Sequence, residues 1–181
     1  MVGDWSAFAA MVANAVIIGW LVPSVIERRS LREMGWQVNF WAIVTAAFAG
    51  LAVFVHMAQW PYGPQAAVAV LVAAFISAGC REENLFRGHL MPTLQENGIS
   101  PLNANLIQAA VFSAGHLPWL VAPVLSWSPA DFIIFGWGSL VKWFVWGLLF
   151  GWLRMRTRSI IPAVAAHGLL DHILFVGYLS D

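Results

Sequence analysis

Glutamate, histidine and aspartate residues lie within apolar stretches of the sequence. Glu82 and Glu83 follow one apolar run, His116 lies in a second, and His167 and Asp171 share a third. A charged side chain at the centre of a membrane-spanning helix costs at least about 2.5 kcal/mol on insertion scales. Ionisable groups in such stretches therefore indicate either mutual pairing or a functional site.

The spacing of these residues predicts which of them pair. Glu83 and Arg87 are four residues apart, as are His167 and Asp171, so on a helix each pair shares one face. Glu82 points about 100° away from Glu83, which leaves one carboxylate for another partner. A solvated helix end and a self-satisfied His–Asp pair would explain the same spacings.

These residue types are suited to hydrolysis of a peptide bond by an activated water. A glutamate in an apolar pocket can act as a general base on water, and one histidine can share that water. A second histidine can donate a hydrogen bond to the oxyanion of the tetrahedral intermediate. Cys80 is the only cysteine, which excludes an internal disulfide and a multi-cysteine zinc site, and we interpret it as a packing residue.

The composition is that of an integral membrane protein. Of the 181 residues, 60% are hydrophobic and 10% are charged, and the mean hydropathy is +0.74. In soluble domains, about a quarter of the residues are charged. The net charge of zero gives no basic field for nucleic acid. We expect one transmembrane domain over residues 1–181, with no nucleic-acid partner and an oligomeric state that the sequence leaves open.

Six apolar stretches predict about six transmembrane helices, separated by turns rich in proline and glycine. They cover residues 5–26, 40–60, 66–90, 106–119, 132–153 and 160–179. The stretch from 66 to 179 holds the ionisable groups and forms the expected core, with two accessory helices in residues 1–65.

Eight arginines fall on one side of this predicted topology, and the positive-inside rule makes that side cytoplasmic. They are Arg28, Arg29, Arg32, Arg81, Arg87, Arg154, Arg156 and Arg158. The predicted fold is thus an all-α, multi-pass bundle in a plasma membrane, with a polar cavity open to the cytoplasm.

Three motifs in order resemble those of the CPBP family, also called ABI. This family contains the type II CAAX prenyl endopeptidases and bacteriocin-processing relatives. The matching residues are Glu82-Glu83-x-x-x-Arg87-Gly88, Phe112-x-x-x-His116 and His167-x-x-x-Asp171. The resemblance covers roughly residues 66–175.

The resemblance implies an intramembrane glutamic endopeptidase that cuts a membrane-associated peptide near the cytoplasmic face, and we expect it in a prokaryotic plasma membrane. By analogy, Glu82 activates water with help from His116, and His167 and Asp171 form the oxyanion hole. Glu83 and Arg87 would support the base. No cofactor or metal is implied by this mechanism. The family has also been described as metalloproteases with these side chains as ligands, but a free glutamate must remain as base.

Several alternatives stay open. The substrate could be a prenylated C-terminus, a bacteriocin leader or a sorting helix. A non-catalytic immunity or scaffold protein would need only the Glu83–Arg87 pair, and a b-type haem protein would use His116 and His167 as axial ligands.

The roles of two charged residues and three further histidines are also expectations. An ionised Asp171 only accepts hydrogen bonds, so Asp171 must be protonated or act by orienting His167. Lys142 either pairs with a buried carboxylate such as Asp171 or faces water. The remaining histidines are expected to be packing or interfacial residues, namely His56, His89 and His172.

Overall fold

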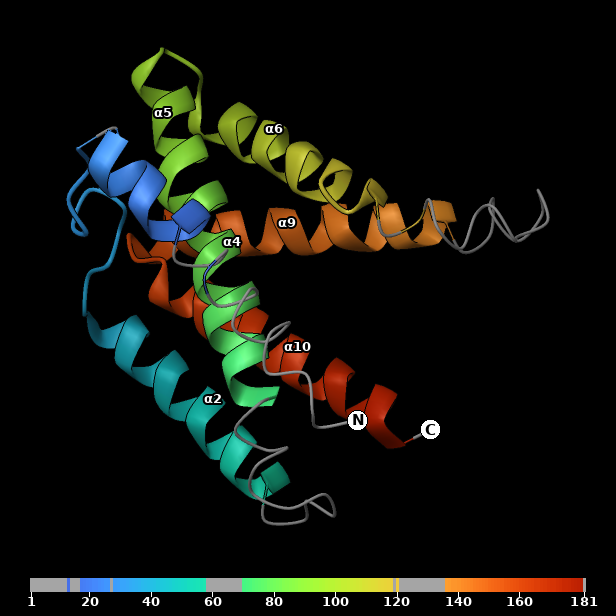
Figure 1. Ribbon diagram of the computed structural model, residues 1–181. Helices are drawn as coiled ribbons and strands as arrows, with labels where there is room; N and C mark the ends of the chain where they lie inside the picture. Colours follow the sequence, from blue (N-terminus) through green and yellow to red (C-terminus); the bar gives the residue numbers. More distant parts are fainter. Residues whose placement is uncertain are drawn as a thin grey trace.

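The computed structural model describes residues 13, 17–26, 28–57, 70–118, 120 and 136–180, and these residues are mainly helical (Figure 1). The elements are η1 (Ile17–Ile26), α2 (Phe40–Met57), η2 (Val72–Cys80), α4 (Arg81–Glu83), η3 (Asn84–Leu90), α5 (Met91–Glu96), α6 (Pro101–Ala114), α9 (Trp137–Thr157) and α10 (Ile161–Ser180). The η segments have wide, π-type turns. The all-helical fold class expected from the sequence is confirmed.

Helix α2 is long and apolar enough to cross a membrane, and it alone passes this test among the described residues. Its large apolar side chains point outward, with Phe48 68% and Phe54 70% exposed. A helix surface of this kind is suited to contact with lipid rather than with water. The other five expected spans are not shown by helix length and composition.

The helix that carries the two glutamates is longer than the sequence predicts. Segments η2, α4, η3 and α5 follow one another without a break from Val72 to Glu96, past the expected end at residue 90. Asn97 and Gly98 end this helix, and Gly98 has a left-handed φ of +85° that suits glycine. Glu82 and Glu83 therefore lie in the middle of a helix rather than at its end.

For the fourth predicted helix, residues 106–119, both predicted boundaries were wrong. Helix α6 begins at Pro101, where the Ser100 side chain accepts a hydrogen bond from the backbone N–H of Asn103, and it ends at Ala114. His116 consequently lies in a turn just beyond α6, with its backbone N–H bonded to the carbonyl of Ser113 at 3.1 Å.

The remaining boundaries agree more closely with the predictions. Helix α2 begins at the expected residue, α9 extends to Thr157, and α10 matches the stretch 160–179 to within one residue at each end. Half of the stretch 5–26, residues 58–60, 66–69 and 119, and the start of the stretch 132–153 lie outside the described residues.

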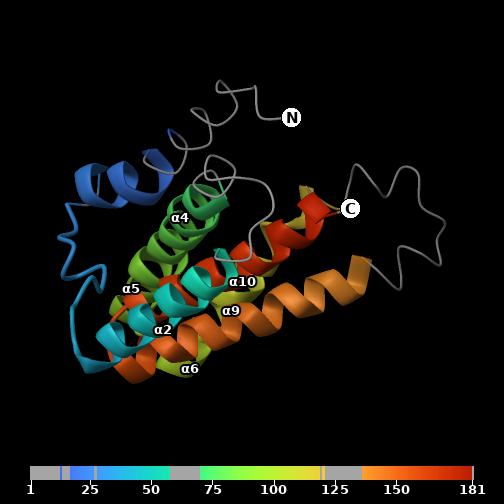
Figure 2. The same ribbon diagram turned by 90° about the horizontal axis from the view of Figure 1, so that it is seen from below.

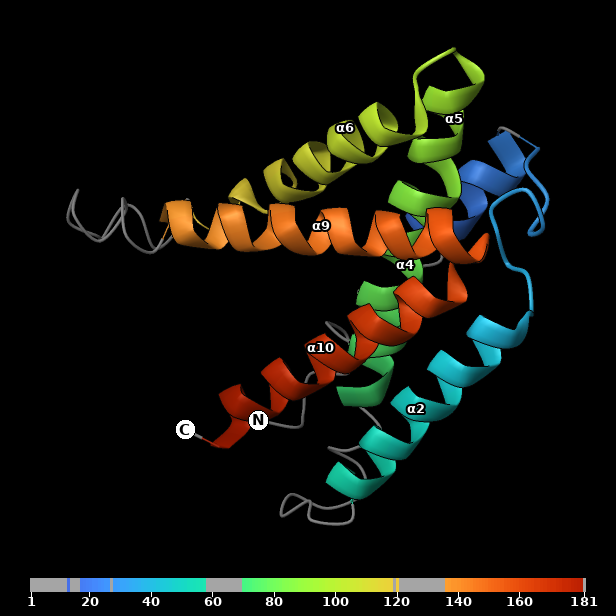
Figure 3. The ribbon, with the colours of Figure 1, turned by 180° about the vertical axis from the view of Figure 1, so that it is seen from behind.

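Close helix packing builds the core around α9 and α10. Helix α6 lies along α9, and α10 packs on η2, α2 and α9 (Figures 2 and 3). Glycines permit the closest approaches, because a Cβ at Gly151 of α9 would lie 1.8 Å from Asn105 Oδ1 of α6. A Cβ at Gly168 of α10 would likewise lie 2.3 Å from the ring of Phe75 in η2. Small residues have this role in membrane helix bundles.

Two arginine-bearing connections lie side by side. The backbone N–H of Ile160 donates to the carbonyl of Gly35 at 3.0 Å. The side-chain amide of Asn39 donates to the carbonyl of Thr157 at 2.8 Å. The arginines of the loop 28–39 and those that end α9 are thus at one end of the described structure.

The contact between α6 and α9 predicts the effect of an added methyl group. Gly151→Ala should lower the free energy of unfolding by about 1–3 kcal/mol, because the new Cβ overlaps Asn105. Thermal unfolding in detergent measures this loss. Gly138→Ala in the same helix is the matched control, since a Cβ there meets nothing within 4 Å. Equal stability of the two variants would contradict the packing.

Candidate active site

The carboxylate of Glu83 joins two helices inside the bundle. Its Oε1 atom lies 3.0 Å from Arg87 Nη1 and 2.8 Å from His167 Nδ1. Glu83 and Arg87 are fully buried and His167 is 5% exposed, so all three groups are shielded from solvent. The expected Glu83–Arg87 contact is present, and the bond from α10 to Glu83 adds a link that the sequence did not predict.

The second terminal nitrogen of the Arg87 guanidinium binds the backbone of α9. This Nη2 atom donates to the carbonyl of Gly147 at 2.9 Å, and Gln108 Nε2 donates to the same oxygen at 2.9 Å. Asn105 Nδ2 donates to the next carbonyl, that of Leu148, at 3.2 Å. One polar network therefore connects the glutamate helix with α6, α9 and α10.

Aromatic rings enclose this network. The guanidinium carbon of Arg87 lies 4.7 Å from the centroid of Phe112 and 5.3 Å from that of Phe150. Phe150 also stacks on the His167 ring, with centroids 4.8 Å apart. Cation–π contacts of this kind strengthen when the cation is desolvated, as it is here.

All four expected catalytic side chains line one cavity of about 260 Å³. They reach it from α4, from the turn after α6 and from α10. Its lining consists of Glu82, Phe112, His116, Lys142, Trp143, Trp146, Phe150, His167, Leu170 and Asp171.

Glu82 has two different carboxylate oxygens. Oε1 forms an ion pair with the neighbouring Arg81 at 2.6 Å, a contact the sequence analysis did not predict. Oε2 is buried, accepts no hydrogen bond from a described residue and lies 3.9 Å from His167 Nε2. Glu82 thus presents one held oxygen and one oxygen available to a ligand or water.

The His116 ring is fixed by its neighbours. Its Nδ1 atom lies 2.8 Å from the backbone carbonyl of Phe112, and a carbonyl oxygen can only accept, so Nδ1 carries the proton. The ring stacks on Trp143 with centroids 4.4 Å apart. In the neutral imidazole, Nε2 is then the atom that can accept a proton.

Asp171 stands beside the second ring nitrogen of His167. Its Oδ2 atom lies 3.6 Å from His167 Nε2, one helical turn along α10. His167 consequently has a carboxylate at each nitrogen, Glu83 at Nδ1 and Asp171 at Nε2. The predicted sharing of one helix face by His167 and Asp171 is confirmed.

Lys142 does not form the suggested ion pair with Asp171 among the described residues. Its Nζ atom lies 5.4 Å from the centroid of Trp143, and the side chain is exposed while also lining the cavity. The arrangement agrees with the other expectation for Lys142, that it faces a water-accessible space.

Sequence reasoning missed two sets of supporting residues. Asn105 and Gln108 are buried amides three positions apart in α6, and that spacing within an apolar stretch was the available signal. His56 Nδ1 lies 3.0 Å from His172 Nε2, which joins α2 to α10. Residues so far apart in the sequence give no local signal of their contact.

In the described ranges, no group of three or more His, Cys, Asp or Glu side chains is arranged to hold a metal ion. His167 Nδ1 is already bonded to Glu83, and His116 Nδ1 to a backbone carbonyl.

The burial of Glu83 predicts a large loss of stability when its charge is removed. Glu83→Gln should lower the free energy of unfolding by about 3–5 kcal/mol, because it leaves Arg87 buried without its carboxylate. Chemical unfolding of the purified protein measures the loss. The matched control is Glu96→Gln, which breaks the exposed ion pair with Arg29 and should cost less than about 1 kcal/mol. An equal loss of unfolding free energy in both variants would contradict the larger contribution that we assign to the buried Glu83 network.

Comparison with known proteins identifies the family of the chain. The searches of curated proteins and of solved structures gave no match. The family model described as type II CAAX prenyl endopeptidase Rce1-like matches residues 64–173, which contain the three motifs and every expected catalytic residue. Membership of this family implies a membrane protein and suggests a protease acting on a protein substrate. The chain belongs to the Rce1-like family of type II CAAX prenyl endopeptidases.

Proposed function

We propose that this protein is an intramembrane endopeptidase that hydrolyses a peptide bond with a water activated by Glu82. The observation that carries the proposal is the single cavity lined by Glu82, His116, His167 and Asp171 in a member of a protease family. Family membership favours hydrolysis over the scaffold and haem-protein alternatives.

Glu82 is the general base of the proposed reaction. The ion pair with Arg81 holds Oε1, so Oε2 is the oxygen that accepts a proton from water. A buried polar atom without a partner among the described residues calls for an explanation, and catalysis is one of the recognised ones. The activated water attacks the substrate carbonyl carbon, and its proton moves to the Glu82 carboxylate.

His116 shares the attacking water with Glu82. The Phe112 carbonyl fixes the proton on Nδ1, which leaves the Nε2 lone pair to accept a hydrogen bond from that water. Stacking on Trp143 limits rotation of the ring. The histidine thereby orients the water rather than competing with Glu82 for its proton.

His167 stabilises the oxyanion, and Asp171 positions His167. His167 Nδ1–H donates to the Glu83 carboxylate, so His167 must be an imidazolium for Nε2–H to donate to the developing negative charge, and the carboxylates of Glu83 and Asp171 beside the ring favour that charged form. An ionised Asp171 cannot donate, but at 3.6 Å from Nε2 it can orient the ring. When the tetrahedral intermediate collapses, the C–N bond breaks and the leaving amine takes the proton held by Glu82.

The membrane setting of this reaction extends the same proposal. Six spans with the arginine-bearing end on the cytoplasmic side would place the cavity in the inner half of the bilayer, within reach of a peptide close to that face. The exposed apolar surface of α2 supports contact with lipid. The pairing of the loop 28–39 with the end of α9 gathers arginines of both segments at one end, which the positive-inside rule would make cytoplasmic. A prenylated C-terminus is the substrate class that the family name suggests.

The proposal predicts the loss of cleavage when the base or its partner is changed. Glu82→Gln and His116→Ala should each lower kcat by about 10²–10⁴-fold, the usual contribution of a positioned acid–base group. New C-termini in membranes of cells expressing the wild type or Glu82→Gln identify the substrate. The purified full chain in liposomes then gives kcat on that peptide.

Glu33→Gln is the control for this experiment. It makes the same chemical change in the exposed loop 28–39, where Glu33 contacts only its neighbour Ser30 in the hydrogen bonds described. It should cleave like the wild type, and all variants should unfold at similar temperatures. Full activity of Glu82→Gln would refute the mechanism.

A further inference from the structure

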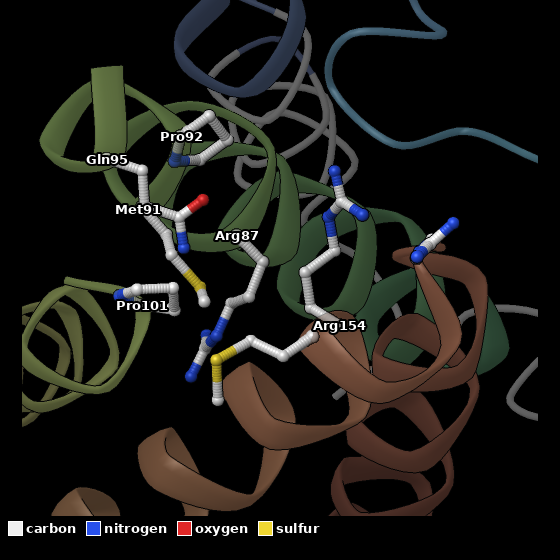
Figure 4. A pocket seen from close by; sticks show the side chains of 8 residues that line it. Arg87, Met91, Pro92, Gln95, Pro101 and Arg154 are labelled. Carbon is white, nitrogen blue, oxygen red and sulfur yellow. The ribbon is translucent and has the colours of Figure 1, made fainter.

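A second cavity of about 270 Å³ is separate from the candidate active site, and Arg87 is one of its lining residues. It lies between η3, α5, the start of α6 and the end of α9. Figure 4 shows Arg87, Met91 and Gln95 on one side of it and Arg154 on another. None of Glu82, His116, His167 and Asp171 lines this space.

The lining of this cavity is basic. Three of its residues are arginines and none is acidic, and the arginines are Arg87, Arg154 and Arg158. Glu83 offsets the charge of Arg87. Within the described part of the chain, neither Arg154 nor Arg158 forms an ion pair, so two guanidinium charges are left without a carboxylate.

Arg154 is held in place although its charge is not compensated. Its guanidinium lies against the backbone of Gly35, where a Cβ would stand 2.6 Å from Cζ and where φ is +90°. Its Nε–H is buried and has no acceptor among the described residues. A buried donor without an acceptor among the described residues calls for an explanation, and a bound anion that accepts from it is one.

We propose that this basic cavity binds an anionic phosphate group. The planar guanidinium fork matches the oxygens of phosphate and can bind two of them at once. Met91 and Met155 supply apolar walls beside the arginines, which suits the glycerol and first methylene groups of a phospholipid. Basic pockets between helices at the cytoplasmic side of a membrane protein bind anionic headgroups. A lipid headgroup and soluble phosphate share this chemistry.

The test titrates the full chain in non-ionic detergent with three probes. They are dihexanoyl-phosphatidylglycerol, dihexanoyl-phosphatidylcholine and inorganic phosphate, with calorimetry as the readout. Arg154→Gln and Arg158→Gln should each weaken binding of phosphatidylglycerol about tenfold, as expected for one lost charge-assisted hydrogen bond. Arg156→Gln is the matched control, because Arg156 is exposed in the last turn of the same helix and does not line the cavity.

The outcomes separate the sources of the anion. Binding of inorganic phosphate with the same dependence on Arg154 and Arg158 shows that the phosphate alone suffices. Binding of phosphatidylglycerol without phosphate shows that the lipid is required, and both results support the site. Equal losses in Arg156→Gln and Arg158→Gln, or no preference for phosphatidylglycerol over phosphatidylcholine together with no phosphate binding, would overturn it. Melting temperatures of the variants verify that each one folds.

Discussion

The buried carboxylate of Glu83 is the contact on which the rest of the structure depends. It binds Arg87 of its own helix and His167 of α10 through a single oxygen, and Arg87 continues to the backbone of α9. Buried charges are tolerated only when they are paired and hydrogen-bonded, so the three helices must approach in one register for the network to form. The network therefore also sets the rotation of α10, so that the face that carries His167 is turned toward the cavity.

Two neighbouring glutamates have different environments because they are adjacent on one helix. Glu83 turns into the bundle and is fully buried, whereas Glu82 points about 100° away and lines the cavity. The π-type turns of η2 and η3 flank these residues, and such turns occur frequently at functional sites. In the proposed mechanism, one carboxylate is used for structure and the other for chemistry.

The sequence predicted the parts of the site that depend on local spacing. The Glu83–Arg87 and His167–Asp171 contacts follow from separations of four residues, which bring side chains together on any helix. Contacts between helices could not be derived in this way, as the bond of His167 to Glu83 and that of Gln108 to Gly147 show. The helix end expected near residue 90 was wrong because the polar run from Glu82 to Arg87 resembled a solvated end. Tertiary pairing buries it instead. Gly115, next to the end of α6, was the signal that His116 lies beyond that helix.

The most direct test of the central claim is an experimental structure of the wild-type chain in a lipid nanodisc at a resolution that shows ordered water. Our account predicts a water oxygen within about 3.2 Å of both Glu82 Oε2 and His116 Nε2, the reach of a hydrogen bond. Glu82 turned toward lipid, or the two side chains too far apart to share one water, would contradict it.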